Sequence, residues 1–253
     1  MPSTAAFTLT GLTVDNPDLP VLTPLVPGIA FRYKMQDRQG SSLVDSSPEG
    51  NNGTIVGSPT FTTEGVIFDS SSQRIESPVA GDSDSFTAIC VAKPAIVGSG
   101  VPFGNFFLNG GENIRRGWNV WFTSSGGVGQ FSAAIAGQNP NDPTEHANLG
   151  VSTPDINYAP NEWCLCVLRL DGPAEIVRAA FKTLGNSGER NFASSALDYS
   201  KGEEIWVGQT QGGYSFTGGV AYAAYWEAYL TDEQLEAQVT SIRSDLLRRG
   251  VSF

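Results

Sequence analysis

The sequence of 253 residues is poor in cysteine and histidine. Its three cysteines, Cys90, Cys164 and Cys166, are an odd number, and the last two are spaced to share one face of a strand. We interpret them as free thiols of the core, because a metal or redox site needs further His or Cys ligands nearby. The single histidine, His146, has no nucleophile motif beside it, which argues against a Ser-His-Asp or Cys-His catalytic site.

Positive charge is scarce as well, with 15 Lys and Arg residues against 26 Asp and Glu residues and a net charge of −11. Nucleic-acid binding depends mainly on Lys and Arg that neutralise phosphate, so we expect no nucleic-acid partner. The sequence lacks an apolar run of the roughly 18 residues that a membrane-spanning helix needs, so we expect no membrane insertion. The first ten residues lack a basic region followed by an apolar core, and we expect no secretory signal.

Glycine and proline are abundant, at 29 and 15 residues, and hydrophobic residues make up 40% of the chain. This composition is typical of a turn-rich, all-β protein. Ile29–Met35 alternates apolar and polar residues with a period of two, which predicts a half-buried strand at the start of the domain. Further strands are predicted at about 101–108, 116–123, 128–136, 163–170, 175–183, 203–209 and 216–229.

The stretch from Asp45 to Pro94 carries three consecutive motifs. They read D-S-S-P-E-G-N-N-G-T at 45–54, G-V-I-F-D at 65–69 and S-F-T-A-I-C-V-A-K-P at 85–94. These motifs resemble the first third of the laminin-G-like, concanavalin A-like jelly-roll domains, and the run at 216–235 resembles their last strand and short helix. The resemblance implies an antiparallel jelly-roll β-sandwich and by itself no activity.

The chain divides into three predicted parts, namely an arm at 1–28, the sandwich at 29–230 and a helical segment at 231–253. The arm is too rich in proline for a helix or a central strand and too apolar for a solvated linker. It either packs along its own sandwich, docks onto another subunit, or is disordered. Its candidate docking residues are Leu9, Leu12, Val14, Leu19, Val21, Leu22 and Leu25.

A helix is predicted at about 231–249. Thr231 and Gln234 form a capping box, and Gly250 occupies the position of a left-handed cap residue. The helix either covers an end of the sandwich or forms a subunit contact. Its apolar stripe consists of Leu235, Val239, Ile242 and Leu246.

The segment 137–160 contains four prolines and little periodicity, so it is interpreted as the longest loop. Catalytic carboxylates of the Glu-x-Asp-x-x-Glu type that retaining glucanases carry on one strand do not occur, and we expect no enzyme activity. We expect no cofactor, with a structural calcium ion as the alternative. Its candidate ligands are Asp45, Asn51, Asp69, Asp82, Asp84, Asn141 and Asp142, which also suit turns.

Two tryptophans, Trp121 and Trp206, fall on the polar faces of predicted strands. Such rings can stack on sugars, and the alternative is that the arm or a loop packs over them.

For function, the resemblance and the apolar arm favour a non-enzymatic bacteriophage virion component, a decoration or tail-associated subunit made in the host cytoplasm. Its expected partners are capsid or tail proteins and further copies of itself, with a host-surface glycan as a further ligand. The alternative is a lectin-like carbohydrate-binding module, and the third is a glycoside-active enzyme.

Overall fold

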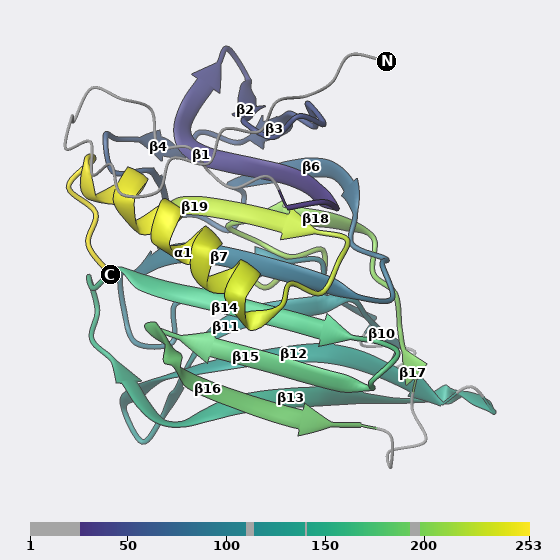
Figure 1. The fold of residues 1–253 in the computed structure, drawn as a ribbon. Helices are drawn as coiled ribbons and strands as arrows, with labels where there is room; N and C mark the ends of the chain where they lie inside the picture. Colours follow the sequence, from purple (N-terminus) through teal and green to yellow (C-terminus); the bar gives the residue numbers. More distant parts are fainter. Residues whose placement is uncertain (1–25, 110–113, 140, 193–197) are drawn as a thin grey trace, which may run out of the picture.

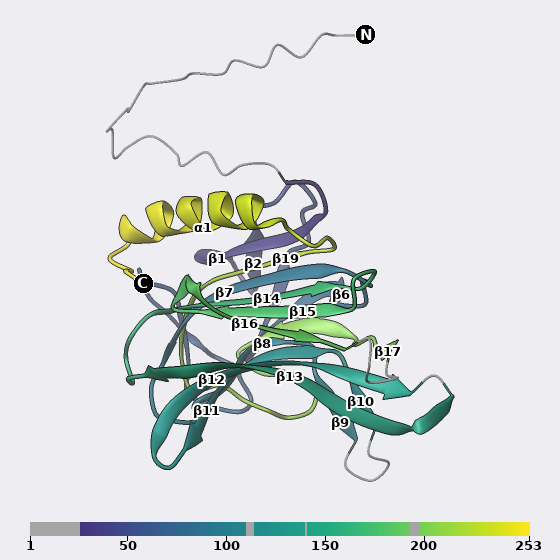
Figure 2. The ribbon, with the colours of Figure 1, turned by 60° about the horizontal axis from the view of Figure 1, so that its bottom comes forward.

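The computed structural model describes residues 26–109, 114–139, 141–192 and 198–253, which form three layers (Figures 1 and 2). Two antiparallel β-sheets face each other, and helix α1 (Asp232–Leu247) lies on the outer face of one of them. The fold is therefore the predicted all-β jelly-roll sandwich with a C-terminal helix. The predicted arm residues Leu9 to Leu25 lie outside the described residues.

The sheet beneath α1 is called the helix-side sheet. Its strands, in spatial order, are β1 (Ile29–Gln39), β19 (Gly218–Trp226), β7 (Phe86–Pro94), β14 (Cys164–Asp171), β15 (Ile176–Phe181) and β16 (Thr183–Asn191).

The opposite sheet is called the far sheet. Its strands, in spatial order, are β3 (Gly53–Val56), β6 (Arg74–Ala80), β18 (Glu204–Val207), β8 (Gly100–Gly104), β11 (Trp118–Ser125), β12 (Val128–Asn139) and β13 (Asp142–Tyr158).

Short strands complete the two sheets. Strand β2 (Ser42–Asp45) pairs with β1 and β3 and so joins the sheets at one side. Strand β5 (Val66–Phe68) pairs with β19 and with β4 (Thr60–Phe61), and β17 (Asp198–Tyr199) pairs with β12. A separate hairpin consists of β9 (Phe107–Asn109) and β10 (Ile114–Arg116).

Two apolar cores explain why the helix-side sheet is buried on both faces. The first fills the space between the sheets and includes Phe31, Phe86 and Trp118, and the second lies between the helix-side sheet and α1. Strand β1 differs from the prediction, since Ala30 and Arg32 on its expected solvent face are only 7% and 8% exposed. An irregularity between Ile29 and Phe31 places Ile29 in the second core and Ala30 in the first, which the alternation of polar and apolar residues does not reveal.

The Asp45 motif is a structural turn. The Asp45 carboxylate accepts hydrogen bonds from the backbone N–H groups of Arg32, Ser47 and Asn51, each at 2.8 Å, and from the Ser47 hydroxyl at 2.7 Å. The Asn52 side-chain oxygen in turn accepts from the Asp45 N–H at 2.8 Å. These bonds satisfy backbone donors where β2 turns toward β3, which accounts for the residue types of the motif.

Helix α1 begins where the sequence predicts and buries the predicted apolar stripe. Thr231 is its N-cap and forms a capping box with Gln234, and Gly250 has a φ of 79° beyond its C-terminal end. The four residues of the predicted stripe are all buried. The helix covers the outer face of the helix-side sheet rather than an end of the sandwich (Figure 2).

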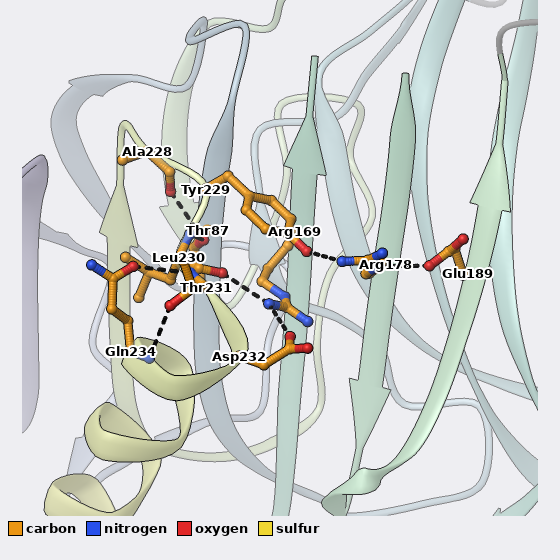
Figure 3. A network of polar contacts seen from close by, with 10 residues as sticks. All are labelled: Thr87, Arg169, Arg178, Glu189, Ala228, Tyr229, Leu230, Thr231, Asp232 and Gln234. Carbon is orange, nitrogen blue, oxygen red and sulfur yellow. Dashed lines mark hydrogen bonds and ion pairs between the residues drawn. The ribbon is translucent and has the colours of Figure 1, made fainter. Parts of the chain in front are cut away.

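A polar network anchors the segment that leads into α1 (Figure 3). The Thr87 hydroxyl donates to the Ala228 carbonyl at 3.0 Å and accepts from the Leu230 N–H at 2.9 Å. The Arg169 guanidinium donates to the Leu230 carbonyl at 2.8 Å and pairs with Asp232 at 2.7 Å. The network therefore ties β7 and β14 to the first turn of the helix.

The predicted loop at 137–160 is wrong. Most of it belongs to β12 and β13, whose pairing includes Gly137 with Ala147 and Ala133 with Val151. Strand β13 lies at the edge of the far sheet, where a proline that cannot donate a hydrogen bond is tolerated. The G-N-S-G sequence at 185–188, which is typical of turns, likewise forms part of an edge strand, β16.

The cysteines are free and buried, as predicted. Burial raises the pKa of the Cys164 thiol to about 12 and raises those of Cys90 and Cys166 as well. Thiols with raised pKa values are poor nucleophiles at neutral pH, so their role in this fold is to fill the core.

Candidate functional site

The two tryptophans predicted from the sequence lie on the outer face of the far sheet. Trp121 belongs to β11 and Trp206 to β18, and β8 separates these strands. Both rings are half-buried, and the alternation that assigns their neighbours Val120, Phe122 and Val207 to the core is confirmed.

Each of these rings already has a neighbour in the chain. The Trp121 ring centroid lies 5.3 Å from that of Tyr214, which belongs to the segment between β18 and β19. The Arg74 guanidinium lies 4.5 Å from the centre of the Trp206 ring and pairs with Glu76 at 2.7 Å. Sugar stacking at these two positions stays a prediction.

A third tryptophan, Trp163, stands directly before β14 and follows a tight turn. Proline is favoured at the first central position of such a turn, and Asn161 follows Pro160 with a φ of 67°, a conformation that asparagine tolerates. The Asn161 N–H donates to the carbonyl of Pro94 at 2.7 Å, which holds the turn against the end of β7. Trp163 is half-buried against the cluster beneath α1.

On one side of Trp163 lies a hollow of about 290 Å³. Thr62, Thr63 and Glu64 line it together with Lys93. The Lys93 ammonium lies 4.6 Å from the centre of the Trp163 ring and 2.7 Å from the Glu64 carboxylate. The hollow thus combines an aromatic edge, hydroxyl groups and an ion pair.

A second hollow of about 510 Å³ also has Trp163 in its wall, so the indole stands at the boundary between the two. Here Lys182 pairs with Glu162 at 3.1 Å, and this contact lowers the pKa of the Glu162 carboxyl. Phe253 contributes a second aromatic ring. The remaining polar side chains are those of Asn161, Thr183 and Ser252.

The chemistry of this Trp163 site suits binding rather than proton transfer. Aromatic rings contact the apolar faces of sugars, and hydroxyl, amide and charged groups bond to sugar hydroxyls. A general acid for glycoside cleavage needs a raised carboxyl pKa, whereas the pKa of Glu162 is lowered. The sequence predicted Trp163 only as the first residue of a strand. The side chains that surround it, Lys93, Lys182 and Phe253, come from other parts of the chain, so no local pattern marks the site.

Within the described residues, no group of three His, Cys, Asp or Glu side chains is placed to hold a metal ion. The predicted calcium ligand Asp45 uses its carboxylate in the turn described above. In the same part of the chain, no helix has the length and apolar character needed to cross a membrane.

Comparison with known proteins defines the fold class. No protein-family model and no curated protein sequence matches the chain. Among solved structures, domain 4 of the arabinanase AbnA from Geobacillus stearothermophilus, in complex with arabinotriose, has a TM-score of 0.53 at 14% identity, covering 84% of this chain and 98% of that one. A sialidase from Trypanosoma rangeli, in complex with 2,3-difluorosialic acid, has a TM-score of 0.57 at 11% identity, covering 88% of this chain and 34% of that one.

The binding domain of Paraclostridial mosquitocidal protein 1 is similar as well, with a TM-score of 0.55 at 9% identity. It is matched over 85% of this chain and 52% of its own length. At these identities the likeness concerns the fold. The chain therefore shares its all-β jelly-roll sandwich with a domain of an arabinanase, a sialidase and the binding domain of a mosquitocidal protein.

Proposed function

We propose that this chain is a carbohydrate-binding module that holds its ligand at Trp163 without cleaving it. The observation that carries the proposal is a half-buried tryptophan at the boundary of two hollows, each of which also offers hydroxyl groups and an ion pair. Proteins that recognise sugars combine an aromatic surface with a few polar groups in this way.

The fold neighbours are consistent with this proposal. The arabinanase domain is similar over nearly its whole length, and its structure contains arabinotriose. The contact with Lys182 lowers the pKa of the Glu162 carboxyl and holds it as a carboxylate, which does not suit the role of a general acid. We therefore expect binding without turnover.

The test is a glycan array probed with the wild-type chain and with Trp163→Ala. We expect the wild type to select one class of oligosaccharide and Trp163→Ala to bind it at least tenfold more weakly, as measured by calorimetry. Trp163→Phe keeps an aromatic ring and should keep most of the affinity. Thermal melting of each variant separates lost binding from lost folding, and chromatography of the incubated ligand tests for cleavage.

Trp121→Ala and Trp206→Ala are the matched comparisons, because these rings are also half-buried and lie on the other sheet. We expect both variants to bind as the wild type does. If one of them loses binding while Trp163→Ala keeps it, the sugar site is on the far sheet, as the sequence predicted. If the array detects no binding to any glycan, the proposal is wrong.

A role in a bacteriophage virion stays a prediction from the sequence. Its supports are the laminin-G-like resemblance and the apolar, proline-rich arm, whose residues 1–25 lie outside the described structure. The two roles are compatible, since a virion subunit can display a glycan-binding domain. Removal of the arm tests this expectation and is described below.

A further inference from the structure

A third hollow, of about 540 Å³, lies beside the first turns of α1. Leu235 and Glu236 of the helix form one wall, and Leu184 and Ser187 of β16 belong to the opposite wall. Val167 of β14 contributes to the floor. Figure 1 shows the reason for this groove, because α1 crosses β19 and β7 and leaves the outer faces of β15 and β16 uncovered beside it.

This groove and the Trp163 site lie on one strip of the helix-side sheet. Residues two apart in a strand face the same side, so Trp163 belongs to the same face as Val167 and Arg169. Strand β15 follows the same course, since Arg178 pairs with Arg169 and the Lys182 N–H bonds to the Leu165 carbonyl. The six residue steps from Trp163 to Arg169, at about 3.3 Å each, separate these two residues by about 20 Å, the length of an oligosaccharide of about four units.

The charges along this strip are neutralised in pairs. Lys182 pairs with Glu162 at the Trp163 end. At the other end, Arg178 pairs with Glu189 at 2.6 Å and Arg169 pairs with Asp232 at 2.7 Å (Figure 3). Such pairs still offer donors and acceptors to hydroxyl groups.

The net charge of the chain also favours a neutral ligand over an anionic one. Glu236, in the helix wall, adds a further negative charge, and the whole chain carries −11. An anionic ligand is therefore disfavoured by long-range repulsion, whereas a neutral polyhydroxylated chain meets matched partners.

We infer that the ligand is a neutral, extended oligosaccharide of about four units, which runs from Trp163 along α1 to the groove between α1 and β16. This inference rests on the proposed function and adds a ligand class and a direction to it. Trp163 provides the stacking surface at one end. The aliphatic floor of the groove and the two arginine–carboxylate pairs receive the units at the other end.

The probes are linear arabino-, xylo- and cello-oligosaccharides of two to six units, titrated by calorimetry against the wild-type chain. For at least one series, we expect the affinity to rise at least tenfold between two and four units and then to level off. The affinity should change less than twofold between 50 and 300 mM salt, because the ligand carries no charge.

Ser187→Trp tests the groove itself. Ser187 is exposed and lines the groove, so a bulky side chain there fills it with little effect on the fold. We expect this variant to bind the four-unit ligand only as well as the two-unit ligand, whose affinity stays unchanged. Asn186→Trp is the matched control, because Asn186 is the neighbouring exposed residue of β16 and faces the other side. It should leave both affinities as in the wild type.

The outcomes separate this inference from the proposed function. If Trp163→Ala abolishes binding but the affinity levels off at two units, or Ser187→Trp has no effect, the inference is wrong and the proposed function stands. Tighter binding of uronic-acid or sulfated oligosaccharides than of the neutral series also overturns the inference. If none of the three series binds and Trp163→Ala matches the wild type on the array, both are wrong.

Discussion

Thr87 offers the sharpest test of how α1 is held on the sheet. Its side chain is fully buried in β7, and its hydroxyl bonds to the Ala228 carbonyl and to the Leu230 N–H (Figure 3). Thr87→Val keeps the size and the branching of the side chain but removes both bonds. Thr87→Ser keeps the hydroxyl and removes one methyl group, so the pair separates polar from apolar contributions.

The burial of these groups sets the expected change in the free energy of unfolding for each variant. In Thr87→Val the Leu230 N–H stays buried without an acceptor, which costs about 1–3 kcal/mol, and the lost bond to the half-buried Ala228 carbonyl adds about 1 kcal/mol. We therefore expect the free energy of unfolding to fall by about 2–4 kcal/mol. In Thr87→Ser the missing methyl group should cost about 1 kcal/mol.

Urea unfolding followed by tryptophan fluorescence measures both values, provided that the slope against urea stays constant across the variants. In a thermal scan the Thr87→Val variant should melt about 5–12 °C below the wild type. An unfolding free energy of Thr87→Val within about 0.5 kcal/mol of the wild-type value would contradict a stabilising role of these two bonds, and so would a Thr87→Ser variant that is less stable than Thr87→Val.

Three further predictions follow from the same elements. Leu246→Ala should lower the free energy of unfolding by about 2–5 kcal/mol, because Leu246 is fully buried beneath the helix, and an unchanged urea midpoint would contradict its place in the second core. Arg169 lowers the pKa of the Asp232 carboxyl, so the stability from this pair is present above the ordinary value of 3.8 and is lost as the pH falls through the lowered pKa. Urea titrations of the wild type and of Asp232→Asn should therefore differ at neutral pH and converge in acid, and a constant difference would refute the pairing. A chain that begins at Val26 lacks residues 1–25 of the arm and keeps Val26, which belongs to the second core. It should unfold at the same urea concentration as the full chain but lose its assembly into a native particle or oligomer. Assembly that persists would place the attachment surface elsewhere.

Several elements were predictable from the sequence because their signals are local. The capping box at Thr231 and the stripe of α1 depend on residues within a few positions of one another. The Asp45 turn is likewise made mostly by its own neighbours, which is why its residue types are informative.

The strands that the side-chain pattern did not predict, β13 and β16, are edge strands held by backbone pairing. Strand β13 is rich in proline and polar residues, yet its backbone pairs along most of β12. Strand β16 contains a G-N-S-G sequence that is typical of turns, and it pairs with β15 at the edge of the sheet. Edge strands face solvent on one side and need few apolar residues, so their sequences resemble loops.

The sequence by itself determined the fold class, the position of the helix and the core faces of β11, β18 and α1, because a period of two or 3.6 residues expresses which side of an element is buried. Only the tertiary structure decided where a ligand can bind. The Trp163 site unites the start of β14 with Lys93 at the end of β7, Lys182 after β15 and Phe253 beyond α1. These residues are far apart in the chain and meet because strand order and the docking of α1 bring them together, and no local pattern carries that information.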